Sequence, residues 1–174
     1  MSSDVLDRVL RELRGYIDRS AGAPIELASG TTRVFRQTHS FDAADLDELS
    51  RSLGFSLPTE YSDLLTVIGA AECFVDDRTS SSIEIYDPRE VAASYRDFFA
   101  DPSDLQKFFP IASDRRLQEI VVLVVGRPGP RNIFIVSHDM PPEDWPLLID
   151  EGELTSIAAW LDDALSTDGH LRAH

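Results

Sequence analysis

The densest hydrophobic pattern of the chain lies between Phe109 and Val136 and predicts three consecutive strands. The apolar runs are Phe109–Ala112, Ile120–Val125 and Ile133–Val136. The middle run holds six apolar residues, five of them β-branched, which favours a strand buried on both faces. The glycine- and proline-rich stretch 126–132 follows it and indicates a hairpin to the third strand.

Apolar residues spaced three and four apart predict helices before this block. Residues 4–19 form one amphipathic pattern. A second helix begins after Asp42, a good N-cap, and ends at Gly54. A third begins at Pro58 and ends at Gly69, so the two form a helical hairpin whose apolar stripe can cover a sheet face. Residues 20–40 are weakly patterned, with a possible short strand at Thr32–Phe35.

The remaining pattern predicts two short strands and two further helices. The strands are Cys73–Val75 and Ser82–Tyr86, joined by a polar loop. Asp87 caps a helix that starts at Pro88. The closing helix turns Leu154, Ile157, Ala158, Leu161 and Leu165 inward, with Trp160 at its edge, and the tail after Ser166 is expected to fray.

These elements predict a single α+β domain. Its central, mostly antiparallel sheet is covered by the N-terminal helical hairpin and by the C-terminal helix. We expect an amphipathic helix and linker over residues 1–40, the α+β domain over 41–168 and a flexible tail over 169–174.

Composition narrows the class of protein. At 174 residues the chain has the length of one domain, and its one cysteine, Cys73, can form no intrachain disulfide and is expected to be a small buried hydrophobe. The N-terminus alternates charged and apolar residues, which is typical of neither a signal peptide nor a membrane span. A cytoplasmic protein is therefore expected. The net charge of −15 argues against binding to nucleic acid.

The negative charge is concentrated near the C-terminus. Between Asn132 and Leu171 there is no lysine or arginine, whereas nine acidic residues lie there. Two interpretations stay open: a solvated acidic surface that aids solubility, or a field that attracts a basic partner.

The order of several short motifs resembles the SUKH superfamily, which includes cell-wall-synthesis regulators and many bacterial toxin-immunity proteins. The resemblance covers residues 42–165. Its most specific marks are the Leu-Pro-x-x-Tyr helix start at Leu57–Tyr61 and the Phe-Pro-Ile-Ala-Ser-Asp strand at Phe109–Asp114. Further marks are Leu53-Gly54-Phe55, Leu64-Leu65, Gly69, Ile85-Tyr86-Asp87, His138-Asp139 and Thr155-Ser156-Ile157 leading to Trp160-Leu161.

The resemblance implies a non-enzymatic binding protein, an immunity protein that occupies a cognate protein toxin. If that toxin is a basic nuclease, an acidic surface would compete with its nucleic-acid substrate. The alternative is a regulatory scaffold for a cellular enzyme, as in the cell-wall branch of the family. The oligomeric state is left open.

Candidate partner-binding residues lie in or beside loops that follow or join the predicted strands. They are Asp76, Asp77, Glu84, Asp139, Glu143 and Asp144.

The sequence predicts no catalytic, metal or cofactor site. His138 and Asp139 are adjacent, and neighbours leaving a strand point to opposite faces. A hydrolase that uses His138 with an acidic partner is the hypothesis from a different class. The loop 126–132 lacks the Gly-Lys-Ser or Gly-Lys-Thr of a phosphate-binding loop, and no zinc spacing is present.

Overall fold

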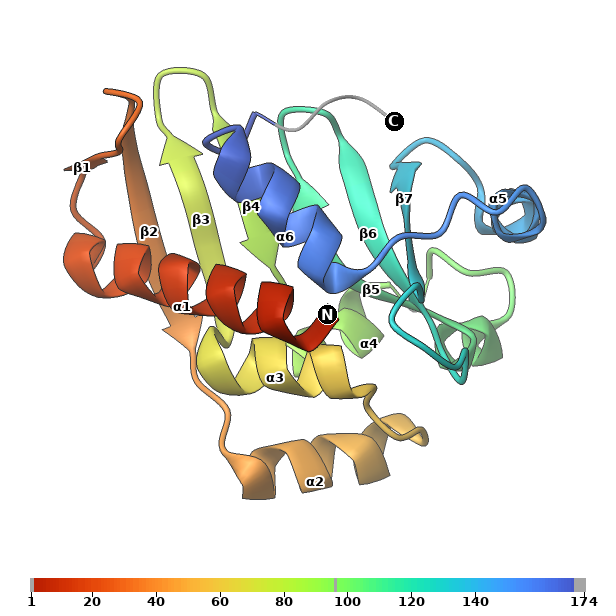
Figure 1. Cartoon of the computed structure of the whole chain (residues 1–174). Coiled ribbons are helices and arrows are strands. Elements are labelled where there is room, and N and C mark those ends of the chain that lie inside the picture. Colours follow the sequence, from red (N-terminus) through yellow and green to blue (C-terminus); the bar gives the residue numbers. More distant parts are fainter. Residues whose placement is uncertain (1, 96, 171–174) are drawn as a thin grey trace.

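The computed structural model describes residues 2–95 and 97–170. Its helices and strands follow one another in the order shown in Figure 1. Their bounds are α1 Ser2–Ser20, β1 Ile25–Glu26, β2 Thr32–His39, α2 Ala43–Leu53, α3 Thr59–Val67, β3 Ala70–Asp76, β4 Ser81–Ile85, α4 Pro88–Ser94, η1 Pro102–Gln106, β5 Phe108–Asp114, β6 Glu119–Val124, β7 Ile133–Ser137, η2 Pro142–Asp144, α5 Trp145–Asp150 and α6 Ile157–Ser166.

The strands of the described residues form one antiparallel sheet in which spatial order equals sequence order, β1 to β7. The predicted α+β class is confirmed, and so are the three strands of the central block. Each of the three matches an observed strand closely: β5, β6 and β7. The possible strand at Thr32–Phe35 is present as the longer β2, whereas β1 was not predicted from the sequence.

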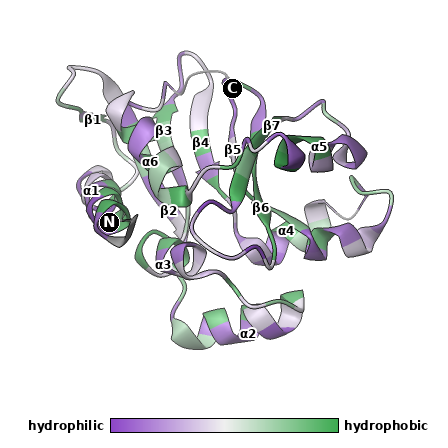
Figure 2. Cartoon of the chain, turned by 45° about the vertical axis from the view of Figure 1, so that its right-hand side comes forward, coloured by the Kyte–Doolittle hydropathy of each residue, from purple (hydrophilic) through white to green (hydrophobic). Residues whose placement is uncertain are grey.

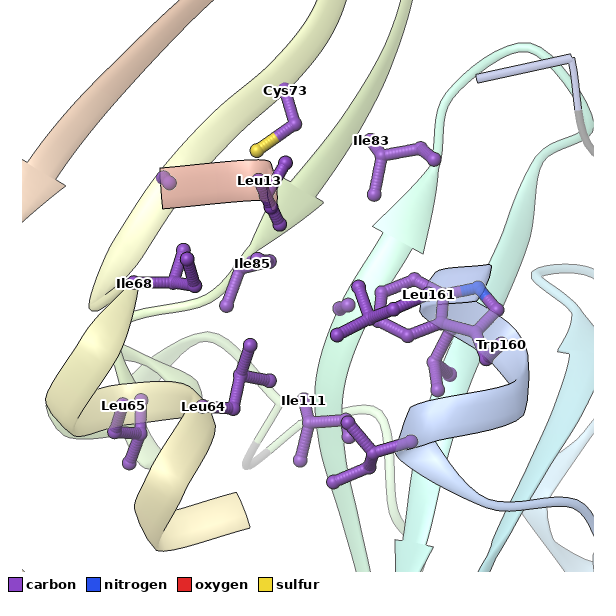
Figure 3. Close-up of a cluster of buried hydrophobic side chains, with 14 of the residues drawn as sticks. Leu13, Leu64, Leu65, Ile68, Cys73, Ile83, Ile85, Ile111, Trp160 and Leu161 are labelled. Carbon is purple, nitrogen blue, oxygen red and sulfur yellow. The ribbon is translucent and has the colours of Figure 1, made fainter. Parts of the chain in front are cut away.

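Helices α1, α3 and α6 cover one face of the sheet (Figure 1). Their apolar stripes meet the inward side chains of β2 to β7 in the main hydrophobic core. Figure 3 shows this core, where Leu64 and Leu65 of α3 and Leu161 of α6 point toward Ile85 and Ile111 of the sheet. Burying side chains of this size stabilises the fold by roughly 1.5–3 kcal/mol each before the entropy cost of ordering them.

The opposite face of the sheet is divided. Over β5 to β7 it carries a second cluster built around Trp145 of α5 and Phe99. Over β2 to β4 it carries charged side chains instead, among them Arg36, Glu72 and Glu84. The sheet is therefore doubly covered only at its β7 end.

Local signals explain where the helices begin. The Asp42 carboxylate accepts a hydrogen bond from the Asp45 N–H, and the Asp45 carboxylate accepts one from the Asp42 N–H, which completes a capping box for α2. Asp87 caps α4 and Ser156 caps α6 in the same way, each by accepting a backbone N–H. Gly54 ends α2 with a φ of 78°, a conformation that glycine adopts without strain.

Two details differ from the sequence-based expectation. In the helical hairpin, α3 lies on the sheet, whereas α2 lies farther out and buries only Leu49 (Figure 1). Trp160 does not lie at the edge of α6, because its side chain is 3% exposed. Helix α6 packs against both the sheet and α1, so its buried arc is wider than a single stripe.

The two ends of the described chain lie against each other. Helix α1 packs along α6, and Arg8 forms an ion pair of 2.7 Å with Asp162. The stretch after Ser166, expected to fray, is held at residues 167–170: Thr31 donates to Asp168 at 3.2 Å, and Arg33 lies 2.7 Å from the His170 ring. Residues 171–174 of the predicted flexible tail lie outside the described residues.

Candidate functional site

Six carboxylates gather around the short helix α5. They are Asp139, Glu143, Asp144, Asp150, Glu151 and Glu153, called here the acidic segment. All six are exposed. Asp150 belongs to α5, which is about 9 Å long, and the other five lie in the short stretches directly before and after this helix.

The position of this segment is fixed by Trp145. The indole is fully buried, contacts the rings of Phe99 and Phe134, and donates its Nε1–H to the Met140 carbonyl at 3.2 Å. Pro141 and Pro142 precede it with the restricted backbone that suits a turn and a helix start. A buried aromatic anchor thus holds an otherwise polar segment against the β7 end of the sheet.

One apolar side chain stands out of the acidic segment. Leu147 of α5 is 58% exposed, the most exposed large hydrophobic residue of the described chain. Figure 2 shows α5 beside β7, with hydrophobic and hydrophilic bands along the same short helix. An exposed apolar side chain within an acidic, exposed stretch of chain suits a protein-docking surface, in which an apolar anchor is accompanied by a polar rim.

The carboxylates of the acidic segment form no ion pair with a basic side chain of the described residues. Eight basic residues form ion pairs elsewhere: Arg8 with Asp162, Arg14 with Asp18, Arg33 and Arg78 with Asp76, Arg36 with Glu72, Arg89 with Asp87, Lys107 with Asp104 and Arg115 with Glu84. Within the described residues, the acidic stretch seen in the sequence is therefore a stretch of exposed charge without ion-pair partners.

Asp76, a predicted contact residue, has a structural role. Its carboxylate is 9% exposed and lies 3.4 Å from Arg33, itself 4% exposed, and 3.5 Å from Arg78. Burial raises the pKa of Asp76, but the Arg78 N–H and the charges of Arg78 and Arg33 outweigh it, so the net pKa lies below its ordinary value. Its neighbour Asp77 is exposed at the tip of the β3–β4 hairpin.

Glu84, another predicted contact residue, lies on the open face of the sheet directly opposite Glu72. Like charges in facing positions repel each other, and each is compensated by an arginine: Arg36 holds Glu72 at 2.8 Å and Arg115 holds Glu84 at 3.2 Å. The two glutamates and Arg89 line a polar pocket of about 370 Å³. Glu84 thus already forms an ion pair within the protein, and its side chain is only partly exposed to solvent.

The structure separates the six predicted contact residues into distinct surfaces. Asp139, Glu143 and Asp144 share the acidic segment. Asp76 ends β3 and Asp77 follows it. Strand β3 lies four positions from β7 in the sheet, a separation of about 19 Å between the two strands. A single small interface at the acidic segment would therefore reach three of the six. The sequence did not indicate α5 or Leu147, because six residues are too few for a helical period to be recognised.

The described residues around His138 do not form a catalytic constellation. The His138 side chain is exposed and its ring contacts Phe98 at a centroid distance of 5.9 Å, and no hydrogen bond from it to a carboxylate is found among the described residues. In the same part of the chain, no group of three histidine, cysteine or acidic side chains could hold a metal ion. Burial raises the pKa of the Cys73 thiol to about 12, which makes it a poor nucleophile at neutral pH.

Comparison of the chain with protein-family models, with curated proteins and with solved structures returned no match. Among the helices described, none combines the length and the apolar character needed to cross a lipid bilayer. The acidic segment and its surroundings are therefore the basis on which a function can be argued.

Proposed function

We propose that this chain is a non-enzymatic binding protein that holds a basic protein partner through the acidic segment. The observation that carries the proposal is the set of six exposed carboxylates without an ion pair among the described residues, in the same segment as the exposed Leu147. The SUKH resemblance supports the more specific form, an immunity protein that neutralises a cognate toxin in the cytoplasm. The single cysteine, free and buried, fits a reducing compartment.

The acidic segment would act first on the rate of encounter. Uncompensated charge of one sign raises the association rate with an oppositely charged partner, and salt screens this effect over about 10 Å at 0.1 M. Leu147 would then supply the apolar contact that slows dissociation. If the toxin is a nuclease, the carboxylates would occupy the basic groove that its phosphate backbone substrate needs.

The test is affinity capture with the tagged protein from a lysate of its native organism, at low and at moderately high salt. We expect a basic toxin domain to be recovered stoichiometrically, with less recovered at high salt. Recovery of a housekeeping enzyme and no toxin would favour the regulatory scaffold instead.

A matched pair of variants assigns the interaction to the surface. The test variant carries Asp139→Asn, Glu143→Gln and Asp144→Asn. The control carries Asp7→Asn, Asp47→Asn and Glu48→Gln, which removes the same charge from exposed positions on α1 and α2. We expect the test variant to associate at least about tenfold more slowly with the captured partner and to lose most of the salt dependence, and the control to change little. Equal kinetics for the two variants would remove the acidic segment from the interface.

A further inference from the structure

Strand β7 forms one edge of the sheet, and its backbone groups alternate between two directions. The His138 N–H donates to the Gln118 carbonyl and the Val124 N–H to the Asn132 carbonyl, so the even-numbered residues of this stretch bond to β6. The backbone groups of Ile133, Ile135 and Ser137 therefore point outward, away from the sheet.

Only the first of these three outward residues is fully paired. Ile133 exchanges two hydrogen bonds with Thr155, at 3.2 and 2.8 Å. The segment that contains Thr155 then leaves the edge, because the Glu153 N–H donates to the Leu148 carbonyl of α5 at 3.1 Å. The Ser137 carbonyl accepts the Met140 N–H at 3.0 Å. Among the described residues no backbone partner is found for the Ile135 N–H and carbonyl or for the Ser137 N–H.

At the other edge of the sheet, neighbouring segments pair with part of β2. There β1 pairs with the start of β2. Beyond it, the Ser20 hydroxyl accepts the Phe35 N–H at 2.9 Å, and the Gly22 N–H donates to the Phe35 carbonyl at 3.0 Å. Exposed edges invite pairing with other chains, and proteins usually block them. The outward groups of Ile135 and Ser137 are therefore available to pair with an added strand.

We propose that the β7 edge receives an extended, basic segment of the partner as an added strand. The inference rests on the proposed function, since the acidic segment supplies the charge that selects the occupant. The segment begins two residues after β7 ends, and α5 contacts β7. A strand rich in lysine or arginine is attracted there, whereas a second copy of this chain, with its net charge of −15, is repelled.

A proline at position 137 tests the edge specifically. The Ser137 N–H faces outward, so Ser137→Pro removes one of the three free edge groups without breaking a hydrogen bond to β6. Ser137→Ala is the matched control, because it also removes the hydroxyl that accepts the Asp139 N–H but keeps the backbone N–H. Both variants leave every carboxylate of the acidic segment in place.

The probe is a short synthetic peptide of alternating lysine and valine with blocked ends, titrated into the uniformly ¹⁵N-labelled full-length protein. In the free protein we expect the amides of Ile135 and Ser137 to exchange with solvent faster than those of Phe134 and Val136. The peptide should protect both amides. Ser137→Pro should weaken peptide binding about tenfold, the loss of one backbone hydrogen bond, while Ser137→Ala changes it less than about twofold.

Two further peptides separate strand addition from simple charge attraction. The same peptide with N-methylated backbone amides carries equal charge but cannot pair along an edge, and we expect it to bind weakly. A peptide with glutamate in place of lysine should not bind.

Equal binding of the methylated peptide, or unchanged binding to Ser137→Pro, would overturn strand addition while leaving the acidic segment as a docking surface. Protection of Ile135 and Ser137 already in the free protein would overturn it too. The two proposals can fail separately. If the acidic-segment variant loses partner binding while Ser137→Pro binds the partner normally, strand addition at β7 is wrong and the proposed function stands.

Discussion

Gly169 lies against the side chain of Phe74: a Cβ atom built on residue 169 would stand 2.4 Å from the Phe74 Cβ. Gly169 also has a φ of 78°, and Phe74 itself has a positive φ of 54° at an irregular point of β3. The stretch that follows α6 is thus fitted to β3 by a contact that leaves no room for a side chain.

Gly169→Ala should therefore destabilise the protein by more than backbone strain alone. An alanine at positive φ costs about 1–2 kcal/mol, and the forced contact adds about 1–3 kcal/mol. Gly126→Ala is the control, because Gly126 has a φ of 76° and open space around it. Urea denaturation compares the two, and equal losses would mean that the Phe74 contact yields without cost.

Substitution by asparagine should lower the stability of the protein at position 76 far more than at position 77. Asp76→Asn leaves the buried Arg33 guanidinium without its charge partner, which is strongly unfavourable in a buried site. Asp77 is exposed at the hairpin tip, so Asp77→Asn should leave the urea midpoint nearly unchanged. A midpoint for Asp76→Asn as high as that for Asp77→Asn would show that the buried ion pair contributes nothing to stability.

The carboxyl of Asp87 should contribute to the loss of folding stability at low pH. Burial raises the pKa of Asp87, but its hydrogen bonds from the Arg89 side chain and backbone and the charges of Arg89 and His39 more than offset this, so the net pKa is lowered. A carboxyl whose pKa is lowered on folding contributes stability that is fully present above the unfolded pKa of about 3.9. That contribution is lost as the pH falls through the folded pKa.

Asp87→Asn keeps an N-cap acceptor for α4 and removes the charge. We expect this variant to be less stable than the parent at pH 7, by at most about 1 kcal/mol because the site is partly screened by solvent. The difference should disappear once the pH lies below the folded pKa, and chemical denaturation at a series of pH values follows it. A difference that stays constant down to pH 2 would assign the effect to capping geometry and not to charge.

The thiol of Cys73 should report global unfolding. It is 1% exposed, and burial raises its pKa to about 12, so a thiol reagent at pH 8 should react with it only when the sheet opens. Ser52→Cys supplies an exposed thiol on α2 for comparison and should react at the rate of a free cysteine. Fast labelling of Cys73 in the parent protein would reveal local opening of β3.

Elements with strong local signals were predicted well from the sequence. Asp42 and Gly54 enclose α2, Asp87 starts α4, and the β-branched run at Ile120–Val125 is β6, because caps and strand periodicity are properties of neighbouring residues. Strand β1 has only two residues, Ile25 and Glu26, and is defined by its pairing with β2, so it leaves no periodic pattern in the sequence.

The candidate site was predicted in part for the same reason. The acidic residues near the C-terminus are visible in the sequence, and the structure adds that Leu147 is exposed among them. The ion pairs that engage Asp76 and Glu84 involve Arg33 and Arg115, which lie 43 and 31 residues away in the chain. Such partners are brought together only by the register of the sheet, which the sequence alone does not specify.

The packing of α1 against α6 also affects how the protein is synthesised. Every strand pairs with its neighbour in sequence, so most of the sheet can assemble in the order in which the ribosome releases it. Helix α1 precedes the whole sheet in the chain, yet its apolar residues Leu6, Leu10 and Leu13 share a core with α6, which follows the last strand. The nascent chain must therefore carry an incompletely covered α1 until α6 has also left the ribosome. A prematurely terminated chain that lacks α6 would keep this surface open and be recognised by chaperones and proteases.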